Sequence, residues 1–325
     1  MKKTVKRVIA IICAIVLVAT CFAGCNGDTN SKYKIGICQF VQHDALNMAT
    51  KGFKEAIIAE LGEENVIFEE QNAAGDSANC AVITGGFVQS NVDLIFANAT
   101  ASLQAAAAAT TTIPIIATSI TDFATALDLS EWNGTTGRNI SGTSDLSPIE
   151  DQAKMIKEIF PNAKQVGLLY CSAEPNSFYQ IDIMRKALDG MGISYKEYTI
   201  ADTNDVNAVV ATASSENDVL YMPTDNTLAT CVETVNSVAM AAGVPIVAGE
   251  EEACKGAGVV TLSVSYYDIG YEAGLMAADI LKNGTDPSTM EVKLSKNLTK
   301  KYVPSRCKAL GVEVPEDYTA IEESK

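Results

Sequence analysis

The chain has 325 residues, with 24 lysines and arginines against 40 aspartates and glutamates, and its net charge is −16. An acidic chain of this kind disfavours nucleic acid as a partner, because the phosphate backbone would repel it. The only histidine is His43, which argues against a zinc or haem site built from histidines, so we expect no metal and no cofactor.

The first 25 residues have the pattern of a bacterial lipid-attachment signal. Basic side chains precede an uncharged apolar run over residues 8–22, and two small residues precede Cys25. The run is shorter than the roughly 20 residues of a membrane-spanning helix, which disfavours the alternative of a retained anchor. We expect residues 1–24 to be a removed signal peptide. Cys25 would be lipidated, and residues 25–32 would tether the protein to the extracytoplasmic face of the cell membrane.

Six further cysteines are scattered singly and form no CxxC pair. This spacing indicates neither a disulfide framework nor a metal cluster. The six are Cys38, Cys80, Cys171, Cys231, Cys254 and Cys307.

From Lys34 onward, apolar strand-like runs alternate with helix-length amphipathic stretches. This alternation predicts parallel sheets with helices on both faces. The pattern occurs twice, since Gly36 and Gly167 lie 131 positions apart and Asp93 and Asp218 lie 125 apart in similar strings. The sequence therefore predicts two similar α/β lobes in tandem.

The chain is expected to cross between the lobes at 139–145 and again at 264–268, with the helix at 269–281 packing on the first lobe. Two open α/β lobes joined in this way form a clamshell, and ligands bind such sheets at the carboxyl ends of the strands. The expected lobes are 33–142 plus about 267–284 for lobe one, and 143–266 plus about 285–325 for lobe two.

Distinctive strings occur through nearly the whole chain, from about Lys34 to Gly284. They are IGICQFVQHDALNMATKGF, EEQNAAGDSAN, VDLIFANATASLQAAA, IPIIATSITD, SGTSDLSPIEDQ, NAKQVGLLYCSAEPNS, VLYMPTDNTLA and YYDIGYEAGLMAADILKNG. In these strings the chain resembles the ABC transporter substrate-binding family that includes the tryptophan and other aromatic amino acid binding lipoproteins.

The resemblance implies a type I periplasmic-binding-protein clamshell made of two Rossmann-like lobes. It implies a monomeric receptor that captures an aromatic amino acid, tryptophan first, in the cleft between the lobes. The ligand would then pass to an ABC permease in the membrane, with the ATPase on a separate chain. A receptor that reports to a membrane kinase or chemoreceptor is the alternative that sequence does not separate from import.

An enzyme is not expected, because the chain has no phosphate-binding loop, no nucleophile elbow and no HExxH motif. The best enzymatic alternative is an amino acid racemase with Cys38 and Cys171 on opposite faces of the substrate. Aligning Gly36 with Gly167 places Leu169, and not Cys171, opposite Cys38. The symmetry required for a racemase is therefore off by two residues.

An amino acid in the cleft needs an acceptor for its ammonium group, donors for its carboxylate and an apolar box for its side chain. Asp225 follows a predicted strand and is the expected ammonium partner, although it would alternatively cap the helix near Thr227. The acidic run 250–252 reads as a solvated helix start, with one glutamate sharing the ammonium as the alternative.

Hydroxyl groups and helix N-termini after the strands are the expected carboxylate donors. Thr100 and Ser102 follow the third strand of lobe one, where a plain helix cap is the alternative. Other candidates that follow strands are Thr118, Ser119, Asp122, Asn176 and Ser177.

Phe40 ends the first strand and could stack on an aromatic ligand, with Tyr266 and Tyr267 as further wall residues. Ordinary packing is the alternative for each of these three. His43 is expected to order its own loop and not to contact the ligand.

Overall fold

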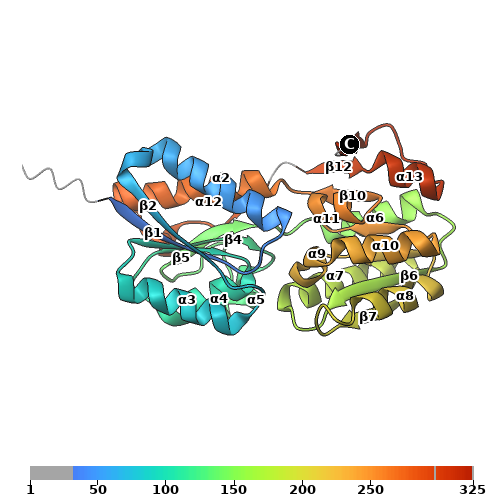
Figure 1. Ribbon diagram of the computed structural model, residues 1–325, viewed down its shortest axis with the longest axis horizontal. Coiled ribbons are helices and arrows are strands. Elements are labelled where there is room, and N and C mark those ends of the chain that lie inside the picture. Colours follow the sequence, from blue (N-terminus) through green and yellow to red (C-terminus); the bar gives the residue numbers. More distant parts are fainter. Residues whose placement is uncertain (1–31, 296–297, 324–325) are drawn as a thin grey trace, which may run out of the picture. The chain divides into compact units, whose positions relative to one another are not determined.

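The computed structural model describes residues 32–295 and 298–323 (Figure 1). The expected signal peptide, Cys25 and most of the expected tether lie outside the described residues. Within them, no helix is both long enough and apolar enough to cross a membrane.

The first lobe is a six-stranded sheet with the strand order β11-β5-β4-β3-β1-β2, and every pairing in it is parallel. Its strands are β1 (Tyr33–Gln39), β2 (Val66–Asn72), β3 (Leu94–Asn98), β4 (Ile115–Ile120), β5 (Ile140–Ser144) and β11 (Lys293–Leu294). Its helices are α2 (Asp44–Leu61), η1 (Glu63–Asn65), α3 (Ser77–Ser90), α4 (Thr100–Ala109), α5 (Phe123–Ala126), α12 (Tyr266–Asn283) and η2 (Pro287–Thr289).

The second lobe is a seven-stranded sheet with the order β13-β12-β10-β9-β8-β6-β7. Its strands are β6 (Gln165–Cys171), β7 (Ser194–Ile200), β8 (Val219–Met222), β9 (Ile246–Ala248), β10 (Val260–Ser263), β12 (Thr299–Tyr302) and β13 (Thr319–Ala320). Its helices are α6 (Ile149–Ile159), α7 (Pro175–Met191), α8 (Val206–Glu216), α9 (Asn226–Thr230), α10 (Val232–Ala242), α11 (Glu251–Gly256) and α13 (Pro304–Leu310).

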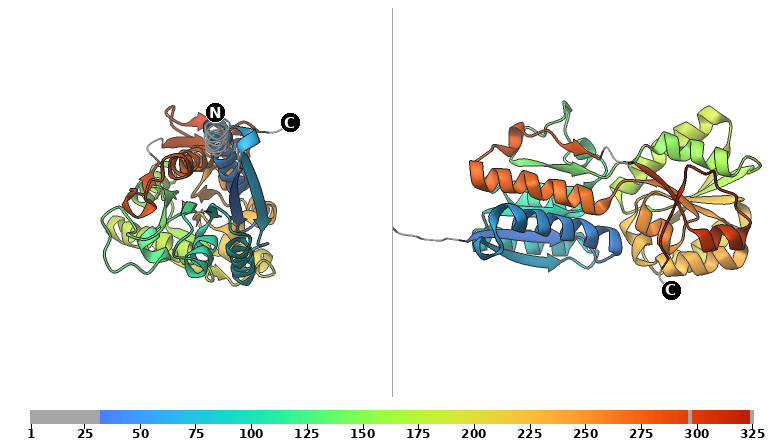
Figure 2. Two further views of the ribbon diagram at one scale, coloured as in Figure 1. Left: turned by 90° about the vertical axis from the view of Figure 1, so that its left-hand side faces the viewer. Right: turned by 90° about the horizontal axis from the view of Figure 1, so that it is seen from above.

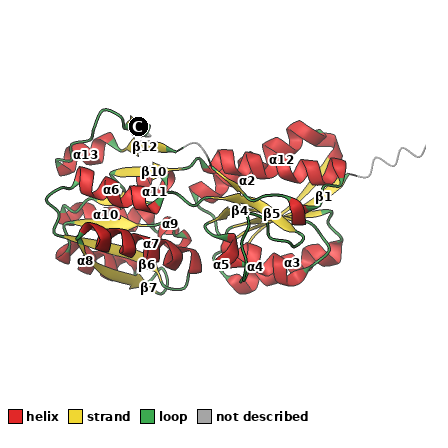
Figure 3. Ribbon diagram, turned by 180° about the vertical axis from the view of Figure 1, so that it is seen from behind, coloured by secondary structure: helices red, strands yellow, loops and turns green. Residues whose placement is uncertain are grey.

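Both sheets are covered by helices on their two faces, as Figure 3 shows with strands in yellow and helices in red. Alternate residues of β3 separate the two cores of the first lobe. Leu94 and Phe96 pack with α2 and α12, whereas Ile95 and Ala97 pack with α3 and α4. Since strands covered on both faces are apolar throughout, the continuous apolar runs of the sequence follow from this arrangement. The predicted α/β fold with two lobes is confirmed.

Two aspartates show that the lobes repeat one design. The strand order β4-β3-β1-β2 of the first sheet recurs as β9-β8-β6-β7 in the second. Before β3, the Asp93 carboxylate accepts a hydrogen bond of 2.7 Å from the backbone N–H of Lys34. Before β8, Asp218 accepts one of 2.7 Å from the backbone N–H of Lys164. Each aspartate thus fixes the start of the neighbouring strand.

Helix α12 follows β10 of the second sheet in sequence but packs against α2 of the first lobe (Figure 2). Glycines allow the two helices to approach closely. A Cβ atom on Gly270 would lie 2.0 Å from the backbone oxygen of Ala49, and one on Gly52 would lie 2.2 Å from that of Tyr267. Any side chain at these positions would force the helices apart.

The chain passes between the lobes later than expected at the first crossing, because residues 140–144 form β5 inside the first sheet. The next crossing lies between β10 and α12, and a third lies between Leu294 and Thr299.

The expected assignment of 285–325 to lobe two is wrong for its first part, since β11 pairs with β5. The Ser141 hydroxyl also donates to the Met290 backbone oxygen at 3.0 Å, which holds this segment on the first lobe. In addition, β12 pairs antiparallel with β10, so the second sheet is mixed.

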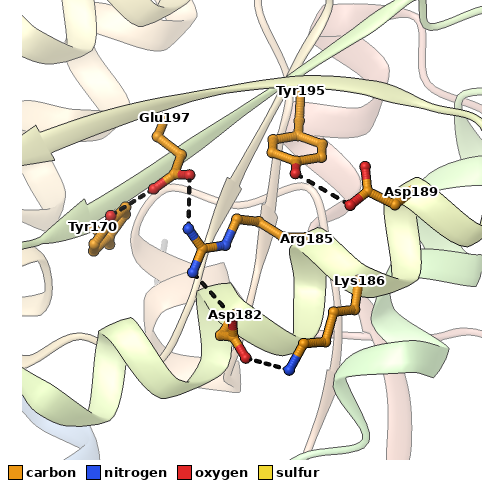
Figure 4. A network of polar contacts seen from close by, with 7 residues as sticks. All are labelled: Tyr170, Asp182, Arg185, Lys186, Asp189, Tyr195 and Glu197. Atoms are coloured by element: carbon orange, nitrogen blue, oxygen red, sulfur yellow. Dashed lines mark hydrogen bonds and ion pairs between the residues drawn. The ribbon is translucent and has the colours of Figure 1, made fainter.

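A polar network on the second lobe joins α7 to β6 and β7 (Figure 4). The Arg185 guanidinium donates to Glu197 at 3.2 Å and to Asp182 at 3.1 Å, while the Tyr170 hydroxyl donates to Glu197 at 2.7 Å. Glu197 therefore links β7 to β6 and to α7 within the second lobe.

The close helix crossing predicts opposite effects of two glycine substitutions. Gly270→Ala should lower the free energy of unfolding by about 1–3 kcal/mol, because the added methyl group collides with the α2 backbone. Gly190→Ala is the control, since no atom lies within 4 Å of a Cβ there. It should raise stability by up to about 1 kcal/mol through helix propensity. Urea denaturation measures the free energy of unfolding of both variants. Equal changes in the two would contradict a close contact between α2 and α12 at Gly270.

Candidate functional site

A cavity lies where the carboxyl ends of strands from both sheets meet, and its volume is about 20 Å³, close to the space of one water molecule. The first lobe contributes His43, Ala45, Leu46, Ser119, Thr121 and Asp145. The second lobe contributes Asn176, Met222, Pro223, Thr224, Asp225, Asn226, Ala229, Glu250 and Ala253, and Tyr266 joins them from the start of α12.

Three buried carboxyl groups line this cavity, and no lysine or arginine is among its lining residues in the described chain. Burial raises the pKa of Asp145 above its usual value. Burial, and secondarily the Glu174 carboxylate, raise the pKa of Asp225 to about 7. Burial also raises the pKa of Glu250 to about 8. A positively charged group in the cavity would relieve the cost of ionising these side chains.

The three carboxyl groups differ in how many hydrogen bonds they already accept. Asp225 caps α9 and takes three donors, namely the backbone N–H groups of Leu228 and Cys171 and the hydroxyl of Ser177. Glu250 accepts two backbone N–H groups at the start of α11. Asp145 accepts the hydroxyls of Thr121 at 3.3 Å and Tyr266 at 2.6 Å. Since a carboxylate has about four acceptor positions, Asp145 and Glu250 keep the most capacity for a ligand.

Ser119 has two unusual properties at the end of β4. Its φ angle is +58°, a left-handed conformation that is rare for residues other than glycine. Its hydroxyl is buried and has no hydrogen-bond partner in the described part of the protein, although the residue lines the cavity. A strained residue with an unpaired buried hydroxyl is typical of a ligand-binding position.

Glu174, which precedes α7, organises the second-lobe wall of the cavity. Its buried carboxylate accepts the backbone N–H and the side-chain amide of Asn226, the backbone N–H and the hydroxyl of Thr227, and the amide of Asn176. Asn226 in turn contacts His43 of the first lobe, with 3.2 Å between Oδ1 and Nε2. Glu174 therefore fixes the turn that carries Asp225.

Of the residues expected in the site, four line the cavity, namely Ser119, Asn176, Asp225 and Tyr266. Asp225 also caps α9, so the structural alternative foreseen for this residue is present as well. Ser177 lies behind Asp225 and donates to it at 2.7 Å. Whether any of these residues binds a ligand stays a prediction.

The other expected residues do not line the cavity. Ser102 contacts the buried thiols of Cys38 and Cys80, and the Thr118 hydroxyl shares a 2.7 Å hydrogen bond with Thr143. Thr100 is buried at the start of α4, and Phe40 packs in the first-lobe core.

Asp122 and Tyr267 also lie outside the cavity, and each has another partner. Asp122 caps α5, and it lies close to Tyr179 of the second lobe, whose pKa is raised by burial and then by this carboxylate. Tyr267 donates to Glu55 on α2 at 2.6 Å. Tyr266, its neighbour in the helix, faces the cavity instead because successive helical residues point about 100° apart.

Asp145, Thr121 and Glu174 were missed by sequence reasoning, and His43 was expected only to order its loop. Asp145 directly follows β5, so it was hidden by the assignment of that segment to a crossing. The thiols of Cys38 and Cys171, required by the racemase alternative, are not among the residues that line the cavity in the described chain.

The raised pKa of Glu250 predicts a specific pH dependence of stability. The folded protein holds a proton on Glu250 between its usual pKa of 4.5 and about 8, where the unfolded chain releases it. This contribution to stability is therefore complete below about pH 4.5 and is lost as the pH rises to about 8. Relative to Glu250→Gln, the wild-type chain should lose stability across this window in urea denaturation of the ligand-free protein. Parallel curves for the two chains would show that Glu250 ionises normally.

Comparison with known proteins shows to which family the chain belongs. Residues 34–323 match the model of a family described as ABC transporter substrate binding protein. A tyrosine-binding protein of Clostridioides difficile is 33% identical over 292 residues, which cover 85% of this chain and 84% of that protein.

Two solved structures are also similar. The structure of an ABC domain from Streptococcus pneumonia in complex with L-Trp has a TM-score of 0.84 and 29% identity, covering 88% of this chain and 97% of the other. A ligand-free, open structure of a substrate binding protein from Clostridium difficile has a TM-score of 0.69 and 33% identity, covering 90% and 100%.

Proposed function

Because the chain belongs to the family of ABC transporter substrate binding proteins, we propose that it is the extracytoplasmic solute-binding protein of an ABC importer and that its ligand is an aromatic amino acid. The observation that carries the proposal is the cavity between strand ends of both lobes, with buried carboxyl groups and the unpaired Ser119 hydroxyl. The tyrosine-binding and L-Trp-bound relatives favour an aromatic side chain.

In the proposed pose, the ligand's ammonium group lies between Asp145 of the first lobe and Glu250 of the second. Both carboxylates are close enough to Tyr266 to raise the pKa of its hydroxyl, after the larger effect of burial. An ammonium ion has three donors and no acceptor, so it suits two carboxylates with free acceptor positions. The sequence predicted Asp225 as the ammonium partner. Because Asp225 already accepts three hydrogen bonds as the cap of α9, we assign the ammonium group to Asp145 and Glu250 instead.

We assign the ligand's carboxylate to the Ser119 hydroxyl, a cavity-lining donor that has no hydrogen-bond partner in the described part of the chain. A hydroxyl can donate one hydrogen bond to a carboxylate, and a charge-assisted bond is stronger than a neutral one. Leu46, Met222, Pro223 and Tyr266 provide apolar surface for the side chain.

Ligand entry requires the lobes to separate, because about 20 Å³ is too small for any amino acid. The described chain superposes better on the L-Trp complex than on the ligand-free, open relative, although the latter has the higher sequence identity. We propose that the ligand stabilises a closed arrangement by bridging carboxylates of both lobes, and that the permease recognises this arrangement.

A thermal-unfolding screen tests the ligand class. Aromatic amino acids should stabilise the protein by about 2.7 kcal/mol at 100 times their dissociation constant, whereas their N-acetyl derivatives, which lack the ammonium group, should not. Stabilisation by sugars or nucleosides instead would overturn the proposed ligand.

The same screen with two serine variants tests the pose. Ser119→Ala should weaken amino acid binding by about tenfold through loss of a hydrogen bond to a charged group. Ser215→Ala is the matched control, because its hydroxyl bonds to the Thr212 backbone oxygen on exposed α8. Equal affinity of the two variants would remove Ser119 from the site.

Membrane attachment through Cys25 is proposed on the sequence pattern alone. In cells that express the full chain, the wild-type protein should be found in the membrane fraction, and mass spectrometry should show lipid on its N-terminal peptide. Cys25→Ser should move the protein to the soluble extracytoplasmic fraction and remove the lipid mass. A Cys231→Ser control should leave both unchanged, and membrane retention of Cys25→Ser would argue for a different anchor.

A further inference from the structure

Glu174 lies at the centre of a hydrogen-bond chain that runs from the second lobe to the first. Its Oε2 atom accepts both the Asn226 backbone N–H at 3.1 Å and the Asn226 side-chain amide at 2.7 Å. Its Oε1 atom accepts the Thr227 backbone N–H and hydroxyl, each at 2.7 Å. Glu174 is only 6% exposed, so these donors replace the water that would otherwise surround its charge.

The orientation of the Asn226 amide follows from these contacts. Because Nδ2 donates to Glu174, Oδ1 must point the other way, and it lies 3.2 Å from His43 Nε2. A carbonyl oxygen only accepts, so His43 must carry its proton on Nε2. Burial lowers the pKa of His43, which favours the neutral ring, and the Asn226 acceptor then selects the Nε2–H tautomer. The hydrogen bond joins the loop after β1 in the first lobe to the start of α9 in the second.

We propose that Glu174 is a positioning residue that orients Asn226 to accept a hydrogen bond from His43, and that this bond between the lobes slows ligand dissociation. The inference rests on the proposed function, since dissociation is defined for an amino acid ligand. Glu174 does not itself line the cavity. It acts through Asn226 and through the turn that carries Asp225.

Other charged groups act on this chain of contacts. Asp44 and Glu174 both favour the charged form of His43, and Glu174 raises the pKa of Asp225. Replacing Glu174 by glutamine removes the negative charge that acts on His43 and on Asp225. A glutamine side chain can both donate and accept, so the Asn226 amide is then free to rotate by about 180°. The variant therefore changes the His43 tautomer as well as the stability of the closed state.

The first measurement uses the single histidine of the chain. The full-length mature protein, purified in detergent without a histidine tag, is labelled with ¹⁵N-histidine and studied by NMR without ligand. The wild-type spectrum should show the Nε2–H tautomer of His43, and Glu174→Gln should show a mixture of tautomers. Glu197→Gln is the matched control, because it removes a carboxylate from the Arg185 network and should leave the His43 signal unchanged.

The second measurement is the dissociation rate of L-tyrosine or L-tryptophan by stopped flow. Glu174→Gln should speed dissociation by about tenfold, and in a His43→Ala background it should do so by less than about threefold, because both changes break the same chain of contacts. Multiplicative effects in the double variant, or an unchanged His43 tautomer in Glu174→Gln, would overturn the inference. Absence of amino acid binding by the wild-type chain would instead reject the proposed function. The NMR measurement is made without ligand, so it would still test whether Glu174 sets the tautomer of His43.

Discussion

Burying a carboxylate without a neighbouring cation costs free energy unless several donors surround it. The ends of β8 and β9 reduce this cost by starting short helices there, so that Asp225 and Glu250 accept the first backbone N–H groups of α9 and α11. Glu174 is satisfied by the same turn that Asp225 begins. The same residues therefore line the cavity and cap the helices, so the acidic wall depends on the helix starts. Because burial still raises the pKa of Asp225 and of Glu250, a cation placed beside them would favour their ionised forms.

Much of the fold was predictable because its determinants are periodic. The apolar runs are covered on both faces, and Asp93 and Asp218 repeat the same backbone contact in the two lobes. The short connecting strands were not predictable. Two residues, as in β11, are too few to show an alternating pattern, and their place in the first sheet depends on pairing with β5, about 150 positions earlier in the chain. The first crossing was misplaced because polar Ser141, Thr143 and Ser144 of β5 resemble a loop.

The site was only partly predictable, because neighbouring residues at a strand end or helix start point in different directions. The sequence placed hydroxyl residues at the end of β4, but only the backbone conformation separates Thr118, which bonds to Thr143, from Ser119, which faces the cavity. Tyr266 and Tyr267 differ in the same way at the start of α12. Asp225 and Asn176 were found because each lies at the N-terminus of the helix that follows a strand of the second lobe, Asp225 after β8 and Asn176 after β6. Glu174 lies between the same strand and Asn176, but its role depends on contacts more than 50 positions away, which the local sequence does not show.

In the described part of the protein, the chain passes three times from one lobe to the other. An odd number of passages places the two ends of the described chain on different lobes, with Tyr33 in the first sheet and β13 in the second. A fluorophore near each end would therefore report directly on the separation of the lobes, with no internal labelling site. With the proposed lipid on Cys25, the first lobe would be the one held near the bilayer, and the second lobe would be the one that moves in the proposed closure.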